Sequence, residues 1–467
     1  MKILHYFLGF PPLHNGGLMI YARDLAKEQL KMGHDVIMLM PGKYRKYSEK
    51  SKIKFYKRQD GLPVYQIINS QPVSFSGVIE PYEFIKDISQ NNYREFLAKN
   101  KIDVLHVHSL SGLPKEFIYE AKKLKVKVVF TTHDYFGLCP KINLFNYNNS
   151  ICLDYRAGEE CVKCNYDSTP RKYVARNLFL SYPLVYKLVK GVYNHIRNYS
   201  GKITSNTKDT LKKVENNNNL YRSKGYAKFR SYYIDILEQM DLIIFNSFVA
   251  KQTFSQYIST ERLHTVVVPV THSQIKDNRK KFEYVPLKDG KVNFVYLGYL
   301  NRMKGFFDLM DALEETKERY KNWQLHIYGD YTQLDLKKYD NKFYKFYGRY
   351  SYDNLPEIFS NASLIIIPSK WKETFGFIGL EAYSYGIPAL VSENVGFSML
   401  IKNNKNGIIY KESKDNLYLK QSIAAILEQP EILQRLNQSI IEDYEFDNHL
   451  IENHAKKIIE LYINVLP

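Results

Sequence analysis

The sequence has no long hydrophobic run. No uninterrupted apolar stretch reaches the roughly 18 residues that a membrane-spanning helix needs. Residues 1–9 are also too short for a signal peptide and lack a small-residue cleavage site, which is more typical of a first β-strand. These absences predict a cytoplasmic protein.

Acidic residues are too few to balance the basic ones. Lys and Arg number 66 against 49 Asp and Glu, which leaves a formal net charge of +17. Excess positive charge favours anionic partners such as nucleic acid, phosphorylated substrates or an anionic membrane surface. The basic residues are spread along the chain and match no nucleic-acid-binding module, so we expect no nucleic-acid partner. We expect a phosphorylated substrate and peripheral contact with the inner face of the cell membrane; general solubility is the alternative use of this charge.

Cysteine is scarce and unevenly placed. The chain has only four, all between residues 139 and 164: Cys139, Cys152, Cys161 and Cys164. A Cys-x2-Cys pair with two earlier thiols, in a reducing compartment, favours tetrahedral zinc over disulfides. The irregular spacing leaves four free thiols as the alternative to a structural zinc site.

The length predicts more than one domain. A chain of 467 residues exceeds what one hydrophobic core supports, and its apolar runs alternate with helical patterns as in a parallel α/β protein. We predict a first domain over residues 1–270, a polar linker over 271–290 and a second domain over 291–447. The amphipathic end, 448–467, forms a helix, and the basic, Tyr- and Asn-rich stretch 166–230 forms a helical insertion.

Two places in the first domain carry candidate binding residues. Gly16 and Gly17 separate the first strand from a helix at 18–32, without the spacing of a dinucleotide fingerprint. Such a pair can admit a phosphate or form a tight turn, and both uses remain open. His133 follows a strand at 125–132, at the sheet edge where open α/β folds bind ligands. His106 and His108, on an earlier strand, are interpreted as structural.

A strand at 364–367 leads into the most informative stretch of the second domain. Glu373 lies in the following loop, a helix begins near Gly376, and Glu381 lies about two turns further along. Amides at a helix N-terminus attract phosphate, and carboxylates accept hydrogen bonds from sugar hydroxyls. Phe375 and Phe377 flank the glycine. A loop with two surface glutamates is the alternative.

A strand at 292–297 leads to a second charged turn. Lys304 lies where this strand passes into a helix, so its charge can help to neutralise a diphosphate. No Asp-x-Asp motif lies near this turn, which predicts that fixed cations replace a divalent ion at such a diphosphate and that a reaction there needs no catalytic metal.

The pattern Glu-x7-Glu enclosing Phe-Gly, followed by Gly-Ile-Pro and preceded by Lys304-Gly305, resembles the donor-binding signature of the family 4 retaining glycosyltransferases. This resemblance implies the GT-B fold, in which two Rossmann-like domains face each other across a cleft and the C-terminal helix crosses back to the first domain. It implies that Glu373 contacts the transferred sugar, Glu381 the nucleotide ribose, and His133 the donor sugar and the acceptor.

The resemblance also implies the reaction. It is transfer of a sugar, with retention, from a nucleotide-diphosphate sugar (most commonly a UDP-sugar) to a saccharide or lipid-linked acceptor in cell-surface polysaccharide biosynthesis. Tyr299 stands where the family has an arginine, and Arg302 is the candidate replacement. A GT-B epimerase or phosphorylase, or a non-catalytic polyanion-binding protein, remain the alternatives.

Overall fold

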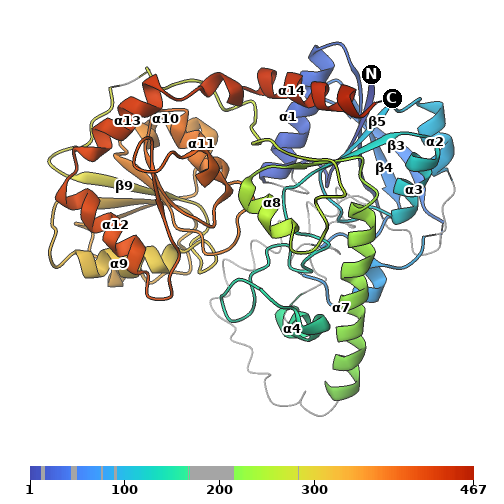
Figure 1. Ribbon diagram of the computed structural model, residues 1–467. Helices are drawn as coiled ribbons and strands as arrows, with labels where there is room; N and C mark the ends of the chain where they lie inside the picture. The colour runs from blue at the N-terminus through green and yellow to red at the C-terminus, as the bar shows by residue number, and fades with distance from the viewer. Residues whose placement is uncertain are drawn as a thin grey trace, which may run out of the picture.

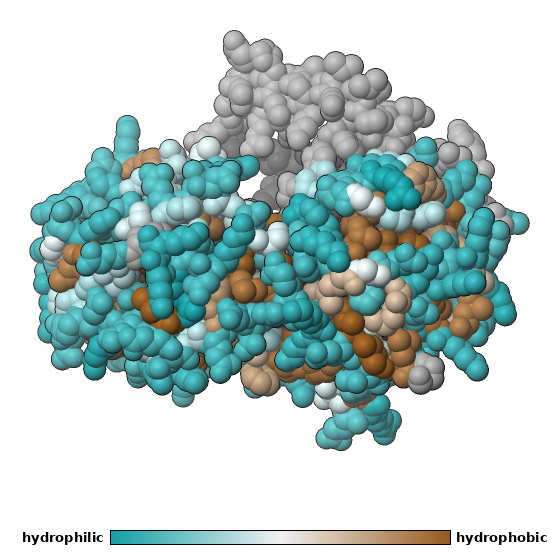
Figure 2. All heavy atoms as spheres, turned by 90° about the horizontal axis from the view of Figure 1, so that it is seen from above, coloured by the Kyte–Doolittle hydropathy of each residue, from teal (hydrophilic) through white to brown (hydrophobic). Residues whose placement is uncertain are grey.

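The computed structural model describes residues 1–11, 16–43, 50–74, 77–88, 92–166, 168, 215–281 and 283–466. These residues form two α/β domains that lie side by side (Figure 1). Seen from above, hydrophilic residues cover most of the second domain, and hydrophobic patches are more frequent on the first (Figure 2). No helix in the described part of the chain is long and apolar enough to cross a membrane.

The first domain is built on an eight-stranded sheet with the strand order β3-β4-β2-β1-β5-β6-β7-β8. All neighbouring pairs are parallel except β3 and β4. The strands are β1 (Lys2–Tyr6), β2 (Asp35–Pro41), β3 (Lys52–Gln59), β4 (Leu62–Ile68), β5 (Val104–Val107), β6 (Lys127–Thr131), β7 (Leu242–Phe245) and β8 (Thr265–Val267). Strands β2, β4 and β3 lie on one side of β1, and strands β5 to β8 lie on its other side. This reversal of strand order creates a topological switch point between β1 and β5.

The helices of this domain are α1 (Gly17–Lys31), α2 (Tyr93–Lys99), α3 (Lys115–Lys123), α4 (Glu159–Cys164), α7 (Glu215–Leu237) and α8 (Phe248–Phe254). Helices α4 and α7 extend below the sheet in Figure 1. The predicted insertion at 166–230 falls largely outside the described residues. Its described end belongs to α7, which continues to Leu237 because Phe229, Tyr233 and Ile236 are buried in the core.

The second domain contains a six-stranded, fully parallel sheet with the order β11-β10-β9-β12-β13-β14. Its strands are β9 (Val292–Leu297), β10 (Trp323–Tyr328), β11 (Tyr344–Gly348), β12 (Leu364–Ile367), β13 (Ala389–Ser392) and β14 (Ile408–Tyr410). Its helices are α9 (Phe306–Thr316), α10 (Leu355–Ser360), α11 (Phe377–Tyr383), α12 (Leu417–Glu428) and α13 (Ile432–Glu442). The switch point of this sheet lies between β9 and β12.

The last helix, α14 (Ile451–Val465), leaves the second domain and packs beside α1 of the first (Figure 1). Its buried face includes His454 and Tyr462, whose polar atoms bond to Tyr21 and His106 of the first domain. The crossing helix therefore completes the core of the first domain, as the family resemblance implied.

Candidate functional site

The site begins with a lysine and a glutamate at the switch point of the second sheet. Lys304 Nζ lies 2.6 Å from Glu373 Oε1, and Ser369 Oγ donates to Glu373 Oε2 at 2.6 Å. Lys304 Nζ also lies 5.4 Å from the centre of the Trp371 ring. The sequence placed Lys304 and Glu373 in one site, and the structure brings them into direct contact.

A glycine allows these two loops to meet. Gly305 has a φ of 68°, and a Cβ atom on it would lie 1.7 Å from the carbonyl oxygen of Pro368. Any side chain here would push the Lys304 turn away from the end of β12. Lys304 can reach Glu373 because residue 305 is glycine.

Glu381 occupies a separate, buried part of the site. Its carboxylate is 3.4 Å from His272 Nε2, and both side chains are buried. The pKa of Tyr352 is raised mainly by burial and also by the nearby negative charge of Glu381. Neither ring nitrogen of His272 has a hydrogen-bond partner among the described residues. Sequence reasoning missed His272 because it follows β8 in a segment predicted as linker.

The loop between these glutamates approaches the first domain. Gly376 has a φ of 92° and precedes α11, which begins at Phe377 as predicted. A Cβ atom on Gly17 would lie 2.6 Å from the Phe377 ring, so the glycine allows α1 and α11 to pack closely. Gly16 has a φ of 143°, and Phe375 is buried beside Phe377. The glycine pair thus provides a turn and a close approach; its contact with phosphate stays a prediction.

His133 lies on the opposite side of this junction. Its carbonyl oxygen accepts a hydrogen bond from Thr374 Oγ1 at 2.9 Å, and Thr374 is the residue after Glu373. Ser247 Oγ, at the start of α8, donates to the carbonyl oxygen of Thr374. The predicted residues of the two domains are therefore neighbours in space.

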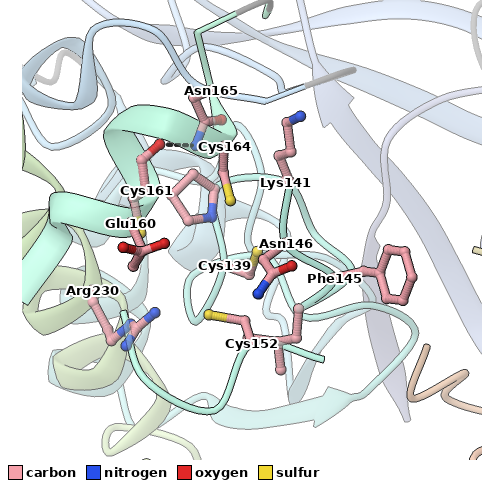
Figure 3. A pocket seen from close by; sticks show the side chains of 12 residues that line it. Cys139, Lys141, Phe145, Asn146, Cys152, Glu160, Cys161, Cys164, Asn165 and Arg230 are labelled. Carbon is pink, nitrogen blue, oxygen red and sulfur yellow. Dashed lines mark hydrogen bonds between the residues drawn. The ribbon is translucent and has the colours of Figure 1, made fainter. Parts of the chain in front are cut away.

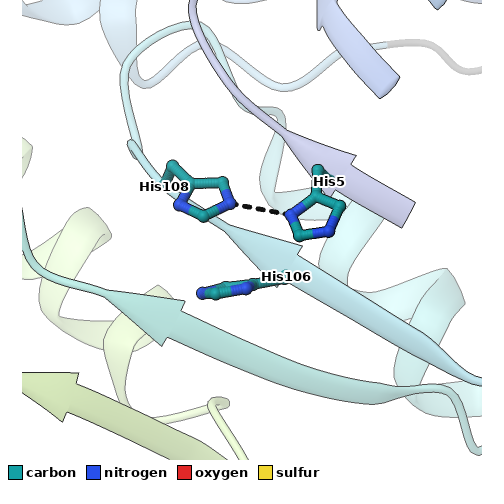
Figure 4. A group of neighbouring side chains, drawn as sticks. All are labelled: His5, His106 and His108. Atoms are coloured by element: carbon teal, nitrogen blue, oxygen red, sulfur yellow. Dashed lines mark hydrogen bonds between the residues drawn. The ribbon is translucent and has the colours of Figure 1, made fainter. Parts of the chain in front are cut away.

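Three further histidines lie behind His133 at the switch point of the first sheet. His5, His106 and His108 are buried, and their closest ring nitrogens lie within 4.8 Å of one another (Figure 4). His5 Nδ1 and His108 Nε2 are 2.9 Å apart, which is within hydrogen-bonding distance. Burial lowers the pKa of His5 to about 4 and that of His133 to about 3, which keeps both rings neutral.

The hydrogen bonds of this network determine which nitrogen of His133 carries the hydrogen. Gln29 Oε1 lies 2.7 Å from His5 Nε2 and can only accept, so the hydrogen of His5 is on Nε2. His5 Nδ1 then accepts from His108 Nε2, and His108 Nδ1 accepts from His133 Nε2 at 3.4 Å. This leaves Nδ1 of His133 as an acceptor. The two histidines interpreted as structural are buried, but His108 also orients the predicted site residue.

Asp134, beside His133, has an unusual environment. Its Oδ1 accepts a hydrogen bond from the Phe136 amide at 2.9 Å, while burial raises the pKa of the carboxyl to about 6. Burial dominates because a single amide compensates only part of the lost hydration.

The candidate arginine lies on the outside of its loop. Arg302 is exposed, with its guanidinium 5.6 Å from the centre of the Phe307 ring, and Tyr299 is 74% exposed. Trp371 was not predicted as a site residue, yet it lies against Lys304 and its buried indole N–H has no partner among the described residues. Its position two residues before Glu373 is the only signal in the sequence.

The four cysteines line one cavity of the first domain, together with Arg230 of α7 (Figure 3). All four are free thiols. Burial, together with the negative charge that Cys139 and Cys164 would carry, raises the pKa of Cys152 to about 11.

Comparison with known families identifies the family of the chain. A model described as Glycosyltransferase Family 4 matches residues 15–157, and one described as Glycosyl transferases group 1 matches residues 277–443. The chain belongs to the family 4 glycosyltransferases of the GT-B class. The first match contains the glycine pair and His133, and the second contains Lys304, Glu373 and Glu381.

Individual relatives of this glycosyltransferase are distant. A protein from the cps region of Klebsiella pneumoniae, described as uncharacterized, is 23% identical over 40% of this chain, and the chain spans about half (53%) of its length. Sucrose-phosphate synthase from Thermosynechococcus elongatus has a similar structure, with a TM-score of 0.59, 15% identity and coverage of 99% of this chain and 98% of the other. Anabaena HepE in complex with UDP gives a TM-score of 0.56, with 14% identity over 99% and 100%. Both structures support the GT-B fold.

Proposed function

We propose that the protein transfers a sugar, with retention at the anomeric carbon, from a nucleotide-diphosphate sugar, with UDP as the nucleotide. The observation that carries this proposal is the contact between Lys304, Glu373 and Ser369, facing His133 of the other domain. A cation, Lys304, and a carboxylate that can accept hydrogen bonds from sugar hydroxyls, Glu373, lie next to each other at one edge of the sheet. The complex of the structurally similar HepE with UDP supports this choice of nucleotide.

Each residue has a separate task in this proposal. The Lys304 ammonium stabilises the negative charge that develops on the diphosphate as the bond to the sugar breaks. Glu373 releases Lys304 and accepts hydrogen bonds from the sugar, while Glu381 binds the ribose. The departing phosphate takes the proton of the acceptor hydroxyl, and no divalent ion takes part. His133 lies beside the transferred sugar and offers Nδ1 as a hydrogen-bond acceptor.

We propose that the first domain, which faces the donor residues through His133, binds the acceptor. We propose a saccharide or lipid-linked saccharide acceptor, and a role in cell-surface polysaccharide synthesis at the inner face of the membrane. The match to a protein of the Klebsiella cps region and the net charge of +17 support this. Within the predicted insertion 166–230, we expect the basic residues 171–190 to contact the membrane, and these lie outside the described residues.

Calorimetry on three variants tests the division of tasks. Glu381→Ala should weaken binding of both UDP and the full donor, by about 1–3 kcal/mol for the lost hydrogen bonds. Glu373→Ala should leave UDP affinity nearly unchanged and abolish most transfer. Lys304→Ala should weaken both ligands and slow transfer. Lys317→Ala is the matched control, because Lys317 also pairs with a glutamate but at the far end of α9.

Product analysis and excess chelator complete the experiment. Transfer of the sugar to an acceptor, unchanged by chelator, is the expected result. Isomerised donor would indicate an epimerase, and sugar phosphate would indicate a phosphorylase. Equal UDP affinity in all three site variants, or salt-sensitive polyanion binding without any donor turnover, would contradict the proposal.

A further inference from the structure

A small cavity outside the donor site collects every cysteine of the chain. It measures about 20 Å³, which is enough for one water-sized particle. Figure 3 shows the sulfur atoms of Cys139, Cys152 and Cys164 turned toward a shared space, with Cys161 at its border. Four thiols around a space of this size are a typical zinc-ligand set.

Local structure brings these thiols together from three separate pieces of chain. Cys139 closes a turn through its amide, which donates to the carbonyl oxygen of Tyr135 at 2.8 Å. The amide of Cys152 donates to the carbonyl oxygen of Leu144 at 2.7 Å, at the end of a short hairpin. Cys161 and Cys164 are three residues apart on α4, so they share one face of that helix.

A buried cation that forms no ion pair with the described residues borders the same cavity. Arg230 of α7 is only 5% exposed, and its Nη1 has no hydrogen-bond partner among the described residues. Its guanidinium stacks 3.4 Å from the centre of the Tyr155 ring. This contact covers one face of the guanidinium but provides no negative charge to balance it. A buried charge without a counter-ion is unfavourable, so this position calls for an anionic neighbour.

The backbone of the cysteine segment is also strained. Five of its non-glycine residues have a positive φ: Ile142, Leu144, Asn149, Arg156 and Ala157. The value of 64° at Ile142 is especially unfavourable because its side chain is β-branched. Such strain persists only where other interactions hold the backbone in place.

We propose that Cys139, Cys152, Cys161 and Cys164 bind one zinc ion, and that Arg230 neutralises part of its charge. Four thiols lose their hydrogens to solvent as four Zn–S bonds form, and the resulting centre carries a net charge of −2. This centre supplies the anion that Arg230 lacks. Among the described residues, only His5, His106 and His108 have three ligand atoms that all lie within 4.8 Å of one another. The cysteine sulfurs are therefore farther apart than this, and they would move inward to form Zn–S bonds of about 2.3 Å.

The proposed ion has a structural role. The segment it would hold contacts the second domain through Asn143, whose Nδ2 donates to Met303 Sδ at 3.2 Å, and through Tyr135, whose ring faces Trp371. Zinc would therefore fix the wall that meets the Lys304 loop. The donor residues themselves lie outside the cavity.

Metal analysis of the full chain, purified under reducing conditions, tests the proposal. We expect about one zinc per chain and, after replacement by Co²⁺, the near-ultraviolet absorption of thiolate–cobalt charge transfer. Cys164→Ser should retain less zinc and lose it faster to a chelator. Arg230→Gln should speed that loss without reducing the number of sulfur ligands. Lys141→Ala, which also borders the cavity, is the control and should keep its zinc.

Three results would overturn the inference. The first is folded protein that takes up no zinc when it is supplied and whose four thiols all react with a thiol reagent. The second is a disulfide among these cysteines in the reduced preparation, and the third is unchanged zinc retention in Cys164→Ser. Because Cys164 is only half-buried, its serine variant is expected to fold, and circular dichroism checks this. Donor binding, measured in parallel, separates failure of this inference from failure of the proposed transfer activity.

Discussion

At the scale of single residues, the site depends on a histidine that burial keeps neutral and on a lysine and a glutamate that form an ion pair. His133 is the clearest example, because it is oriented by His108, His5 and Gln29 rather than by solvent. Lys304 and Glu373 depend instead on each other. These two arrangements make different predictions for substitution and for pH.

Replacing His133 by alanine should remove most of the turnover and leave the melting temperature within a few degrees. The reason is that its ring lies at the domain junction and bonds to one neighbour, at 3.4 Å. Activity and thermal unfolding should be measured together. His326→Ala is the control, since His326 also bonds to one partner, Tyr347, but far from the donor residues. Unfolding of His133→Ala at room temperature would instead assign His133 a purely structural role.

The buried histidines should make the protein sensitive to acid. Burial lowers the pKa of His5 to about 4 and that of His454 to about 3, below the unfolded value of 6.5. The unfolded chain therefore binds more protons, so stability is present above pH 6.5 and is lost as the pH falls toward 4. Asp134, with a pKa raised to about 6, acts in the opposite direction but is a single group. Urea unfolding at pH 7, 6 and 5 should show falling midpoints, and a flat profile would contradict the neutral network.

At the scale of elements, the sequence predicted most of the two sheets. The bounds of β9 and β12 agree with the predicted strands 292–297 and 364–367, because both strands are buried along their whole length and are apolar apart from Asn293 in β9. The hairpin of β3 and β4 was not predicted. Most of β3 is exposed and rich in Lys and Arg, as suits an edge strand, so it lacks the apolar signal.

The candidate site was predictable only where a motif marked it. Lys304, Glu373 and Glu381 follow strands in a recognisable pattern. Gln29 and His272 do not, because their importance comes from contacts between segments far apart in the chain. Such contacts have no local signature in one sequence.

The packing of α1 against α11 gives a prediction at this scale. Gly17→Ala should weaken the approach of the two domains, because the new methyl group would overlap the Phe377 ring. We expect reduced transfer with an unchanged melting temperature, since the backbone of Gly17 does not require glycine. Adding Phe377→Leu should restore part of the activity by making room. If Gly17→Ala keeps full activity, the domains do not need this contact.

At the scale of the whole molecule, the excess positive charge should bring the enzyme to anionic surfaces. We expect cosedimentation with vesicles that contain phosphatidylglycerol, and progressive release as salt rises, because the attraction is screened within about 8 Å at physiological ionic strength. Neutral phosphatidylcholine vesicles are the control. Equal binding to both kinds of vesicle at high salt would show that charge is not the cause.

The crossing of α14 has a consequence for how the protein is made. The ribosome releases the first sheet early, yet Tyr462, which bonds to His106, emerges only after the whole second domain. Until then the polar edge around His106 and Tyr21 lacks its cover, so the first domain cannot reach its final packing during its own synthesis. The two domains must therefore mature together, and a ribosome that stalls before α14 would release a chain with an assembled donor domain beside an unfinished partner.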